Sequence, residues 1–533
     1  MYTAIYQIDL WASFGLGLLL TQLAIPLALR LRLVDRPGAR KLHSQPVAYL
    51  GGAAIILAIV LTLADVIYVY RPIELLHRRA LWVMGISLAG CLLGLADDAW
   101  NLPAKLRFGV QALLALAFCQ FGYCFQAFHL PGLPVINLGW TAVPVTAFFM
   151  LALLNGFNMI DGSDGLAGSV AAVCGFNLAA AAAFAGHTCL LLIGLAVLGA
   201  SLGFLIHNRA PARVYMGSAG TYGLGFLLSA GAVALGSSRY GHDDGTVLTA
   251  NPPLMYHVGL AVLLLAWPAL EVFLSVSRRA LHGRKLSRAD KGHLHHRLLA
   301  LGLGLGPGWV SGIAAGFSLL CGLMVLAFLN QQKGVVSVLS LLAATLVGLG
   351  LAFLGYLDFL RPGLLRARRP HYMIASHFLA MQSLKLETVT TLEQALALVS
   401  QACHELGCLH CRVVMPAKRE GGRPWVWAWK SAAPGAAGAT DRKRLDQRQG
   451  SATWVLRSGL GGEEMGLESR LLMAEFMEKA LPRVRELYAA SGVAERMLAS
   501  AMPYDEEQDF LVRIWRLRSE GGQPAQQAGP PKP

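Results

Sequence analysis

The sequence has few charged residues for its length, and this scarcity indicates the class of protein. Only 14% of the 533 residues are charged, whereas 55% are apolar and the mean hydropathy is +0.51. Soluble domains typically carry about 25% charged residues. The composition therefore disfavours an ordinary soluble protein and predicts membrane spans.

Two further features are lacking. The nine cysteines show no paired framework of the kind that secreted modules use, and several lie inside apolar runs, where cysteine behaves as a small hydrophobic residue. The first apolar run has neither a basic region before it nor a clear cleavage site of small residues. We therefore expect it to be a retained span rather than a signal peptide.

Long apolar runs dominate residues 1–360. Eleven of them approach the ~20 residues that a bilayer requires. They fall near residues 9–30, 50–69, 80–96, 107–123, 138–154, 165–185, 188–206, 221–237, 255–276, 309–329 and 335–358. The sequence therefore predicts an all-α polytopic membrane protein with about eleven transmembrane helices in a domain of residues 1–360.

The basic residues predict the orientation of these helices, because Lys and Arg collect in cytoplasmic loops. With the N-terminus outside, most Lys and Arg residues of this domain fall in cytoplasmic loops, at 31–48, 97–107, 155–164, 207–220 and 277–308. We expect a multi-pass protein of the bacterial inner membrane with a periplasmic N-terminus and a cytoplasmic C-terminus. The net charge of +14 then indicates contact with anionic membrane lipid rather than with nucleic acid.

The last third of the chain is richer in charge and predicts a separate part. We expect a basic interfacial linker at 361–389, a small cytoplasmic α+β module at 390–500 that loosely resembles GAF domains, and a tail at 501–533 with a disordered end. Residues 431–450 are also rich in small and polar residues and are expected to be disordered. Nothing in the sequence identifies a partner for this module.

Cysteine and histidine cluster within the module, at Cys403, His404, Cys408, His410 and Cys411. Their spacing is typical of metal ligands, but a helix that runs into a buried strand explains them more simply.

Each predicted cytoplasmic loop carries polar residues that the outer loops lack. The sets are Asp35 with Arg40, Lys41 and His43; Asp97 and Asp98 with Lys105 and Arg107; Asn155, Asn158, Asp161 and Asp164; His207, Asn208, Arg213, Gly217 and Ser218; and His293, His295, His296 and Arg297. The topology places all five sets on one membrane face.

The acidic residues have two interpretations. Asp97 and Asp98 could merely mark the membrane boundary, but adjacent carboxylates also suit a general base or a cation site. Asn158 and Asp161 are three residues apart, so one helical turn would place both oxygens on one face. Oxygen ligands of this kind suit Mg²⁺, which commonly shares substrate phosphates.

The histidine-rich loop has three interpretations. His293, His295 and His296 could form a zinc site, yet no further Cys or His lies nearby in the sequence. Arg297 beside them favours contact with phosphate, and a solvated basic loop is the plainest alternative. Taken together, the five loops match a reaction between a lipid phosphate and a water-soluble phosphoanhydride.

Four of the motifs resemble those of the polyprenyl-phosphate N-acetylhexosamine-1-phosphate transferases, which belong to glycosyltransferase family 4. The resembling stretches run from Asp97 to Gln111, from Asn155 to Ala167, from Pro211 to Gly217 and from His293 to Leu298. The histidine motif is similar to that of members with UDP-GlcNAc-like donors. The resemblance covers about residues 9–360 and includes the eleven-span layout.

The resemblance implies an activity and site residues. A UDP-sugar would give GlcNAc-1-phosphate, or a related sugar-1-phosphate, to undecaprenyl phosphate, which releases UMP and starts a lipid-linked glycan such as a surface polysaccharide or cell-wall polymer. It implies catalytic roles for Asp97, Asp98, Lys105 and Asp161, substrate binding by Asp164, Arg107, His293, His295, His296 and Arg297, and a metal ligand in Asn158. The metal would be Mg²⁺, with Mn²⁺ as an alternative.

Two positions depart from the family pattern. Glu271 replaces the usual Asp after Pro268, and Ser218 stands where the family has an Asp that binds the metal. The second departure leaves open a weakly active or inactive homologue with a binding or regulatory role. A transporter is disfavoured because the ionisable residues lie at span ends rather than at mid-membrane. The sequence leaves open whether the protein forms a homodimer.

Overall fold

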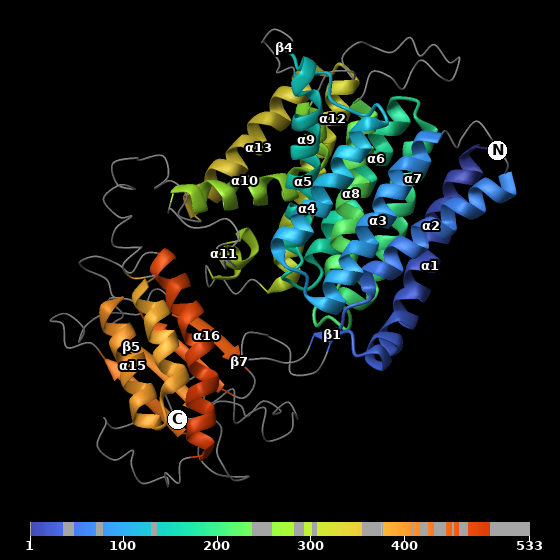
Figure 1. The fold of residues 1–533 in the computed structure, drawn as a ribbon. Coiled ribbons are helices and arrows are strands. Elements are labelled where there is room, and N and C mark those ends of the chain that lie inside the picture. Colours follow the sequence, from blue (N-terminus) through green and yellow to red (C-terminus); the bar gives the residue numbers. More distant parts are fainter. Residues whose placement is uncertain are drawn as a thin grey trace, which may run out of the picture.

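The chain folds into a large helical bundle and a smaller C-terminal part (Figure 1). The computed structural model describes residues 2–35, 47–70, 78–128, 136–236, 258–281, 293–300, 306–353, 375, 377–406, 410–415, 425–430, 444–449, 452–457 and 467–490. The statements below concern these residues.

The bundle is built around one helix. Helix α8 (Gly217–Gly236) has 94% of its apolar window buried, whereas α13 (Lys333–Phe353) has 6% of its window buried and lies at the periphery. The other helices of the bundle are α1 (Tyr2–Leu31), α2 (Gly51–Tyr70), α3 (Arg78–Trp100), α4 (Ala104–Gln120), α5 (Ala142–Ile160), α6 (Leu166–Phe184), α7 (Thr188–Asn208), α9 (Val258–Leu264), α10 (Ala266–Leu281), α11 (Leu294–Ala300) and α12 (Pro307–Leu329).

A polytopic membrane protein is confirmed. Among the described residues, eight helices are long and apolar enough to cross a membrane, or nine if the bent pair α9 and α10 counts as one span. Helix α2 has a shorter apolar stretch and α4 has 17 residues. Every predicted run overlaps at least one helix, but the count of eleven spans stays a prediction.

The ninth predicted run, at 255–276, is not one straight helix as expected. It breaks at Leu265, and α9 and α10 meet at an angle of 101°. In Figure 1, α10 leaves the bundle sideways. Pro268 is a physical cause, because it has no N–H to bond the carbonyl of Leu264 four residues earlier.

The eighth helix begins earlier than the predicted run at 221–237. Gly217 and Ser218, expected in the loop at 207–220, form the first turn of α8. Gly217 has φ of +69°, a left-handed conformation that favours glycine at the start of this helix. The helix therefore presents its amide N–H groups to the polar end of the bundle.

Short strands join the starts of α2 and α8. Strand β1 (Val34–Asp35) pairs with β2 (Val47–Ala48), and Ala48 forms a parallel bridge to Val214. The Gly51 N–H then donates to the Tyr215 carbonyl at 3.2 Å. The loop before α2 is therefore fixed to the loop before α8. The other predicted residues of the first loop, Arg40, Lys41 and His43, lie outside the described residues.

The C-terminal part contains helices and one sheet. Four antiparallel strands have the order β6-β5-β8-β7, and helices α15 and α16 belong to the same part. The elements are α15 (Leu392–Glu405), β5 (His410–Met415), β6 (Trp425–Lys430), β7 (Arg444–Gln449), β8 (Ala452–Arg457) and α16 (Leu467–Ala490). Cys403 and Cys411 are buried in the core of this part, while Cys408 lies outside the described residues.

Two segments of this part have structure that the sequence did not predict. Residues 444–449, expected to be disordered, form β7, and their backbone groups pair with β8. Residues 377–388, expected in the linker, are helical, and Leu379 and Leu386, seven residues apart, are buried with α15 and α16. The domain boundaries stay predictions.

Helices α2 and α8 touch through backbone at two glycines. A Cβ atom on Gly52 would overlap the Cα of Gly220, and a Cβ on Gly220 would overlap the Cα of Gly52. Small residues permit this kind of close approach between membrane helices. The contact lies next to the start of α8 and so helps to place it.

We expect Gly52→Ala to lower the thermal midpoint in detergent, because overpacking typically costs about 1–3 kcal/mol. Gly109→Ala in α4 is the matched control, since nothing lies within 4 Å of a Cβ there. The measurement is thermal unfolding of both purified variants. Equal midpoints would show that α2 and α8 separate without cost.

Candidate active site

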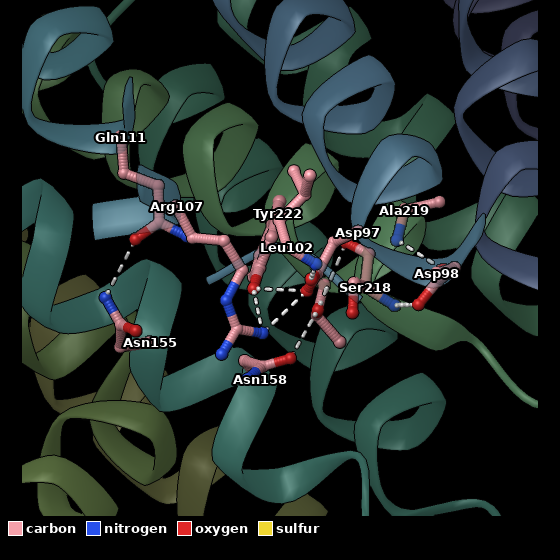
Figure 2. A network of polar contacts seen from close by, with 11 residues as sticks. Asp97, Asp98, Leu102, Arg107, Gln111, Asn155, Asn158, Ser218, Ala219 and Tyr222 are labelled. Atoms are coloured by element: carbon pink, nitrogen blue, oxygen red, sulfur yellow. Dashed lines mark hydrogen bonds and ion pairs between the residues drawn. The ribbon is translucent and has the colours of Figure 1, made fainter. Parts of the chain in front are cut away.

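The predicted acidic residues converge on the N-terminus of α8. Asp97 and Asp98 come from the last turn of α3 and lie beside Ser218 and Ala219 (Figure 2). Asp161 is the C-terminal cap of α5. Helix α3 can approach because Gly94 has no side chain, and a Cβ there would overlap the carbonyl of Ser218. The convergence joins three of the motifs found in the sequence.

Asp98 and Asp161 together accept the first three amide N–H groups of α8. The Gly217 N–H donates to Asp161 Oδ2 at 2.9 Å. The N–H groups of Ser218 and Ala219 donate to Asp98 Oδ1 and Oδ2 at 3.0 and 3.1 Å. These amides have no partner within the helix, and the positive end of the helix dipole favours anions here.

The two carboxylates also act on one another. Burial raises the pKa of Asp161 well above its usual value, and the negative charge of Asp98 raises it further, while the Gly217 N–H opposes both effects. A proton or a cation therefore stabilises Asp161 at neutral pH.

Asp97 has a different environment from Asp98. Its Oδ1 accepts the Leu102 N–H at 3.1 Å, and its Oδ2 accepts both the Arg107 guanidinium at 2.7 Å and the Tyr222 hydroxyl at 3.1 Å. The side chain is only 5% exposed. Asp97 therefore orients Arg107, whose side chain remains 32% exposed and can also reach a ligand.

Asn158 lies on the same side of the cluster. The Thr221 hydroxyl is 3.2 Å from Asn158 Oδ1 and 3.3 Å from the Ser218 carbonyl oxygen, and its single proton can serve one of them at a time. One turn earlier, the Asn155 amide contacts Gln111 at 3.4 Å. The predicted three-residue spacing thus brings Asn158 and Asp161 toward α8 from one helix.

Asp164 connects the second and third motifs. Its Oδ2 accepts the Ala212 N–H at 3.1 Å, and the Ser311 hydroxyl donates to its backbone carbonyl at 3.1 Å. Asn208 adds a second link, because its side chain accepts the Gly165 N–H at 3.0 Å and donates to the Val214 carbonyl at 2.7 Å. The loop after α5 is therefore fixed to the loop before α8.

The histidine loop lies against the second motif. A Cβ on Gly162 would be 2.9 Å from His295 Nε2, so the imidazole packs on the backbone beside Asp161. Burial lowers the pKa of His295 well below its usual value, and the neighbouring His296 and His293 lower it further. His295 is therefore a neutral imidazole at physiological pH, and neither ring nitrogen has a partner among the described residues.

Glu271 anchors this loop to α10. Both carboxylate oxygens accept the Leu294 N–H at 3.1 Å, and Oε1 is 2.9 Å from His293 Nδ1. The ring centroids of His295 and His296 are 4.2 Å apart. Within the described part of the chain, no group of three His, Cys, Asp or Glu residues has a metal-binding arrangement. Glu271 was noted in the sequence only as a departure, and its contacts give it a structural role.

Lys105 and Arg297 are basic residues that the family resemblance assigned to the site. Lys105 is exposed in the first turn of α4, and the described contacts do not join it to the carboxylates. Arg297 is fully buried, and its N–H donates to the His293 carbonyl at 3.0 Å. Their predicted phosphate-binding roles therefore stay predictions.

Sequence reasoning missed three tyrosines. Tyr222 holds Asp97, and Tyr49 and Tyr215 have ring centroids 6.3 Å apart. Burial and then the nearby Asp161 and Asp98 raise the pKa of Tyr49 to about 12, and burial with Asp164 and Asp161 raises that of Tyr215 to about 12. Both phenols therefore keep their protons as hydrogen-bond donors. Tyr215 lies within a recognised motif, whereas no pattern in the sequence pointed to Tyr49.

The cluster suits a hard cation in part. Asp98, Asp161 and Asn158 supply oxygen donors, which Mg²⁺ prefers. Ser218 brings no charge, and its amide donates to Asp98. Two carboxylates and an amide fit a Mg²⁺ ion whose remaining ligands are water and substrate phosphates.

Comparisons with known proteins agree with the motifs. The model of glycosyl transferase family 4 matches residues 80–236. A probable undecaprenyl-phosphate N-acetylglucosaminyl 1-phosphate transferase of Bacillus subtilis is 30% identical over 288 residues, which cover 54% of this chain and 75% of the relative. A decaprenyl-phosphate N-acetylglucosaminephosphotransferase of Mycolicibacterium smegmatis is 30% identical over 297 residues, 52% of this chain and 71% of that protein. A phospho-N-acetylmuramoyl-pentapeptide-transferase of Geobacillus kaustophilus is 28% identical over 304 residues, 54% of this chain and 87% of that protein.

We expect Asp97→Asn and Arg107→Gln to destabilise the protein non-additively, because each leaves the other residue with an unpaired charge. The double variant should be more stable than the sum of the single effects predicts, with a coupling of about 0.5–3 kcal/mol. Thermal midpoints of the four proteins measure this. Additive midpoints would show that the ion pair is not a structural unit.

Proposed function

Since the chain belongs to glycosyl transferase family 4, we propose that it transfers a sugar-1-phosphate from a nucleoside diphosphate sugar to a polyprenyl phosphate. The finer proposal is a UDP-sugar donor, GlcNAc or a related sugar, and undecaprenyl phosphate as acceptor on the cytoplasmic leaflet. The name of the Bacillus relative contains undecaprenyl phosphate and that of the Mycolicibacterium relative decaprenyl phosphate, and both names contain N-acetylglucosamine, which supports the acceptor class and the sugar. The uridine nucleotide of the donor is part of our proposal. The product would start a lipid-linked glycan.

One observation carries the proposal, namely the meeting of Asp98 and Asp161 at the N-terminus of α8. A phosphoanhydride needs positive charge near its oxygens and an oriented nucleophile, and catalysis of phosphoryl transfer is largely positioning and charge neutralisation. The first amide N–H groups of α8 hold both carboxylates in place, and the Arg107 guanidinium, which Asp97 binds, supplies positive charge. The same site holds carboxylates that attract a cation or accept a proton.

The bonds that form and break in this reaction indicate a role for each site residue. An oxygen of the lipid phosphate attacks the phosphorus that bears the sugar. The bond between this phosphorus and the bridging oxygen breaks, and UMP leaves with the bridging oxygen and the bonding electrons. Asp98 would orient or deprotonate the lipid phosphate. Arg107, oriented by Asp97, would bind phosphate oxygen, and the histidine loop would bind the donor.

A magnesium ion held by Asp98, Asp161 and Asn158 would neutralise charge on the donor phosphates. The protonated phenols of Tyr49 and Tyr215 are suited to donate hydrogen bonds to phosphate oxygens near these carboxylates. The neutral His295 can accept or donate a hydrogen bond at the donor side. The contact of His295 with Gly162, next to Asp161, supports its assignment to this site.

A second function is favoured by Ser218. Ser218 stands where the family pattern has an Asp, so the cluster has one negative charge fewer than that pattern supplies. Such a site would bind nucleotide or lipid phosphate and turn over slowly or not at all. Turnover therefore has to be measured separately from binding.

The deciding experiment measures UMP release from a panel of UDP-sugars with undecaprenyl phosphate. We expect release with at least one sugar, and a loss of about 10² or more in Asp98→Asn, the scale of a positioned acid–base group. Asp65→Asn is the matched control, since Asp65 lies about 20 Å along α2 from Gly51 at 1.5 Å per residue and is exposed. UMP binding without release from any sugar would favour the binding homologue.

Ser218→Asp tests the metal. The new carboxylate would lie beside Asp98, so repulsion should lower the thermal midpoint without Mg²⁺. Added Mg²⁺ should restore the midpoint and increase UMP release above wild type. Ser218→Asn has the same size without the charge and should show neither effect. A Ser218→Asp variant with the same Mg²⁺ dependence as Ser218→Asn would remove position 218 from the metal site.

A further inference from the structure

The bend between α9 and α10 leaves one backbone carbonyl that needs a donor. In a continuous helix the Leu264 carbonyl would accept the N–H of residue 268, but that residue is proline and has none. Leu264 is only 2% exposed, so water does not readily reach this carbonyl. In a membrane, an unsatisfied buried carbonyl costs several kcal/mol, so broken helices need a partner from elsewhere.

Asn177 of α6 supplies that partner. Its side-chain amide nitrogen is 3.5 Å from the Leu264 carbonyl oxygen and 2.9 Å from the Ser318 carbonyl oxygen of α12. Asn177 is itself 2% exposed. The two amide hydrogens therefore link α6 to α12 and to the end of α9.

Gly322 makes room for this amide. A Cβ on Gly322 would overlap the oxygen, carbon and nitrogen of the Asn177 side chain. Any larger residue at position 322 would have to displace the amide. The position of Asn177 is therefore fixed by α12 from two sides, through Ser318 and Gly322.

The segment after the bend leads directly to the histidine loop. A Cβ on Gly156 would be 2.6 Å from the Pro268 carbonyl, so α10 packs on α5 between Asn155 and Asn158. One turn later, Glu271 holds His293 and Leu294. The direction of α10 thus determines where His295 meets Gly162.

We propose that Asn177 is a positioning residue for the donor side of the site: it holds the break between α9 and α10 and thereby fixes Glu271 and the histidine loop beside Asp161. Asn177 touches no substrate group itself. Its effect on catalysis rests on the function proposed above, whereas its effect on the histidine loop does not.

The first test follows the loop without any assay of activity. Diethyl pyrocarbonate modifies accessible neutral imidazoles, and mass spectrometry reports the modification at each histidine. His295 is 1% exposed in the intact protein. Asn177→Leu, which keeps the branched shape of the side chain and removes both hydrogen bonds, should increase the modification rate of His295 about tenfold or more, as expected for a locally opened segment.

The matched variants lie on α12. Gly322→Ala retains Asn177 but forces its amide to move, so it should reproduce the effect, and its effect should largely disappear in Asn177→Ala. Gly316→Ala is the control, because nothing lies within 4 Å of a Cβ there. If Asn177→Leu fails to insert into the membrane, the Gly322→Ala pair decides the question. Unchanged His295 modification in both variants would overturn the proposal.

The second test separates positioning from general instability. In a protein that releases UMP, Asn177→Leu should raise KM for the UDP-sugar about tenfold to a hundredfold, as a misplacement of about 1 Å can do, while KM for undecaprenyl phosphate changes less than about twofold. Equal losses for both substrates would indicate a merely structural role and overturn the proposal. A wild type without UMP release would contradict the proposed function, and the histidine measurement would still decide the role of Asn177.

Discussion

The buried N-terminus of α8 is the constraint on which the rest of the site depends. Helix α8 is surrounded by other helices, so its first amides cannot rely on bulk water for acceptors. Asp98 and Asp161 accept them from two different helices. This requirement fixes the last turn of α3 and the end of α5 at the N-terminus of α8. Gly94 permits the close approach of α3 to α8, and Gly52 permits that of α2.

The same arrangement explains why groups of one charge can share a small volume. Two carboxylates side by side repel, but each accepts N–H groups from the positive end of a helix. Asp97 avoids the conflict through Arg107 and Tyr222. Three acidic residues that look equivalent in the sequence thus have three different partners, and only Asp98 and Asp161 cap α8.

Sequence patterns predicted the parts of this structure that follow from local rules. Apolar runs gave the helices, and motif spacing gave Asn158 and Asp161 on one side of α5. Local rules did not predict the bend at Leu265, although Pro268 is a possible signal of it. A proline also occurs within the apolar runs of helices that stay straight enough to span a membrane, so its presence alone does not decide. Nor could they predict Tyr49 or Tyr222, since a tyrosine acquires its role only when distant segments pack around it. The helix at 377–388 was missed because its neighbouring basic residues outweighed two buried leucines.

Ser218 is best understood from the balance of charge at α8. With serine, the helix N-terminus faces two carboxylates, and Asp98 accepts two of its backbone N–H groups. The cluster can then persist without a cation, because burial already favours a proton on Asp161. With a third carboxylate in the first turn, the same volume would hold three acidic groups, and a divalent cation would become a condition of stability rather than an occasional ligand. Under the proposed function, the serine would make cation binding depend more on the phosphates of a bound donor and would so couple metal occupancy to substrate occupancy.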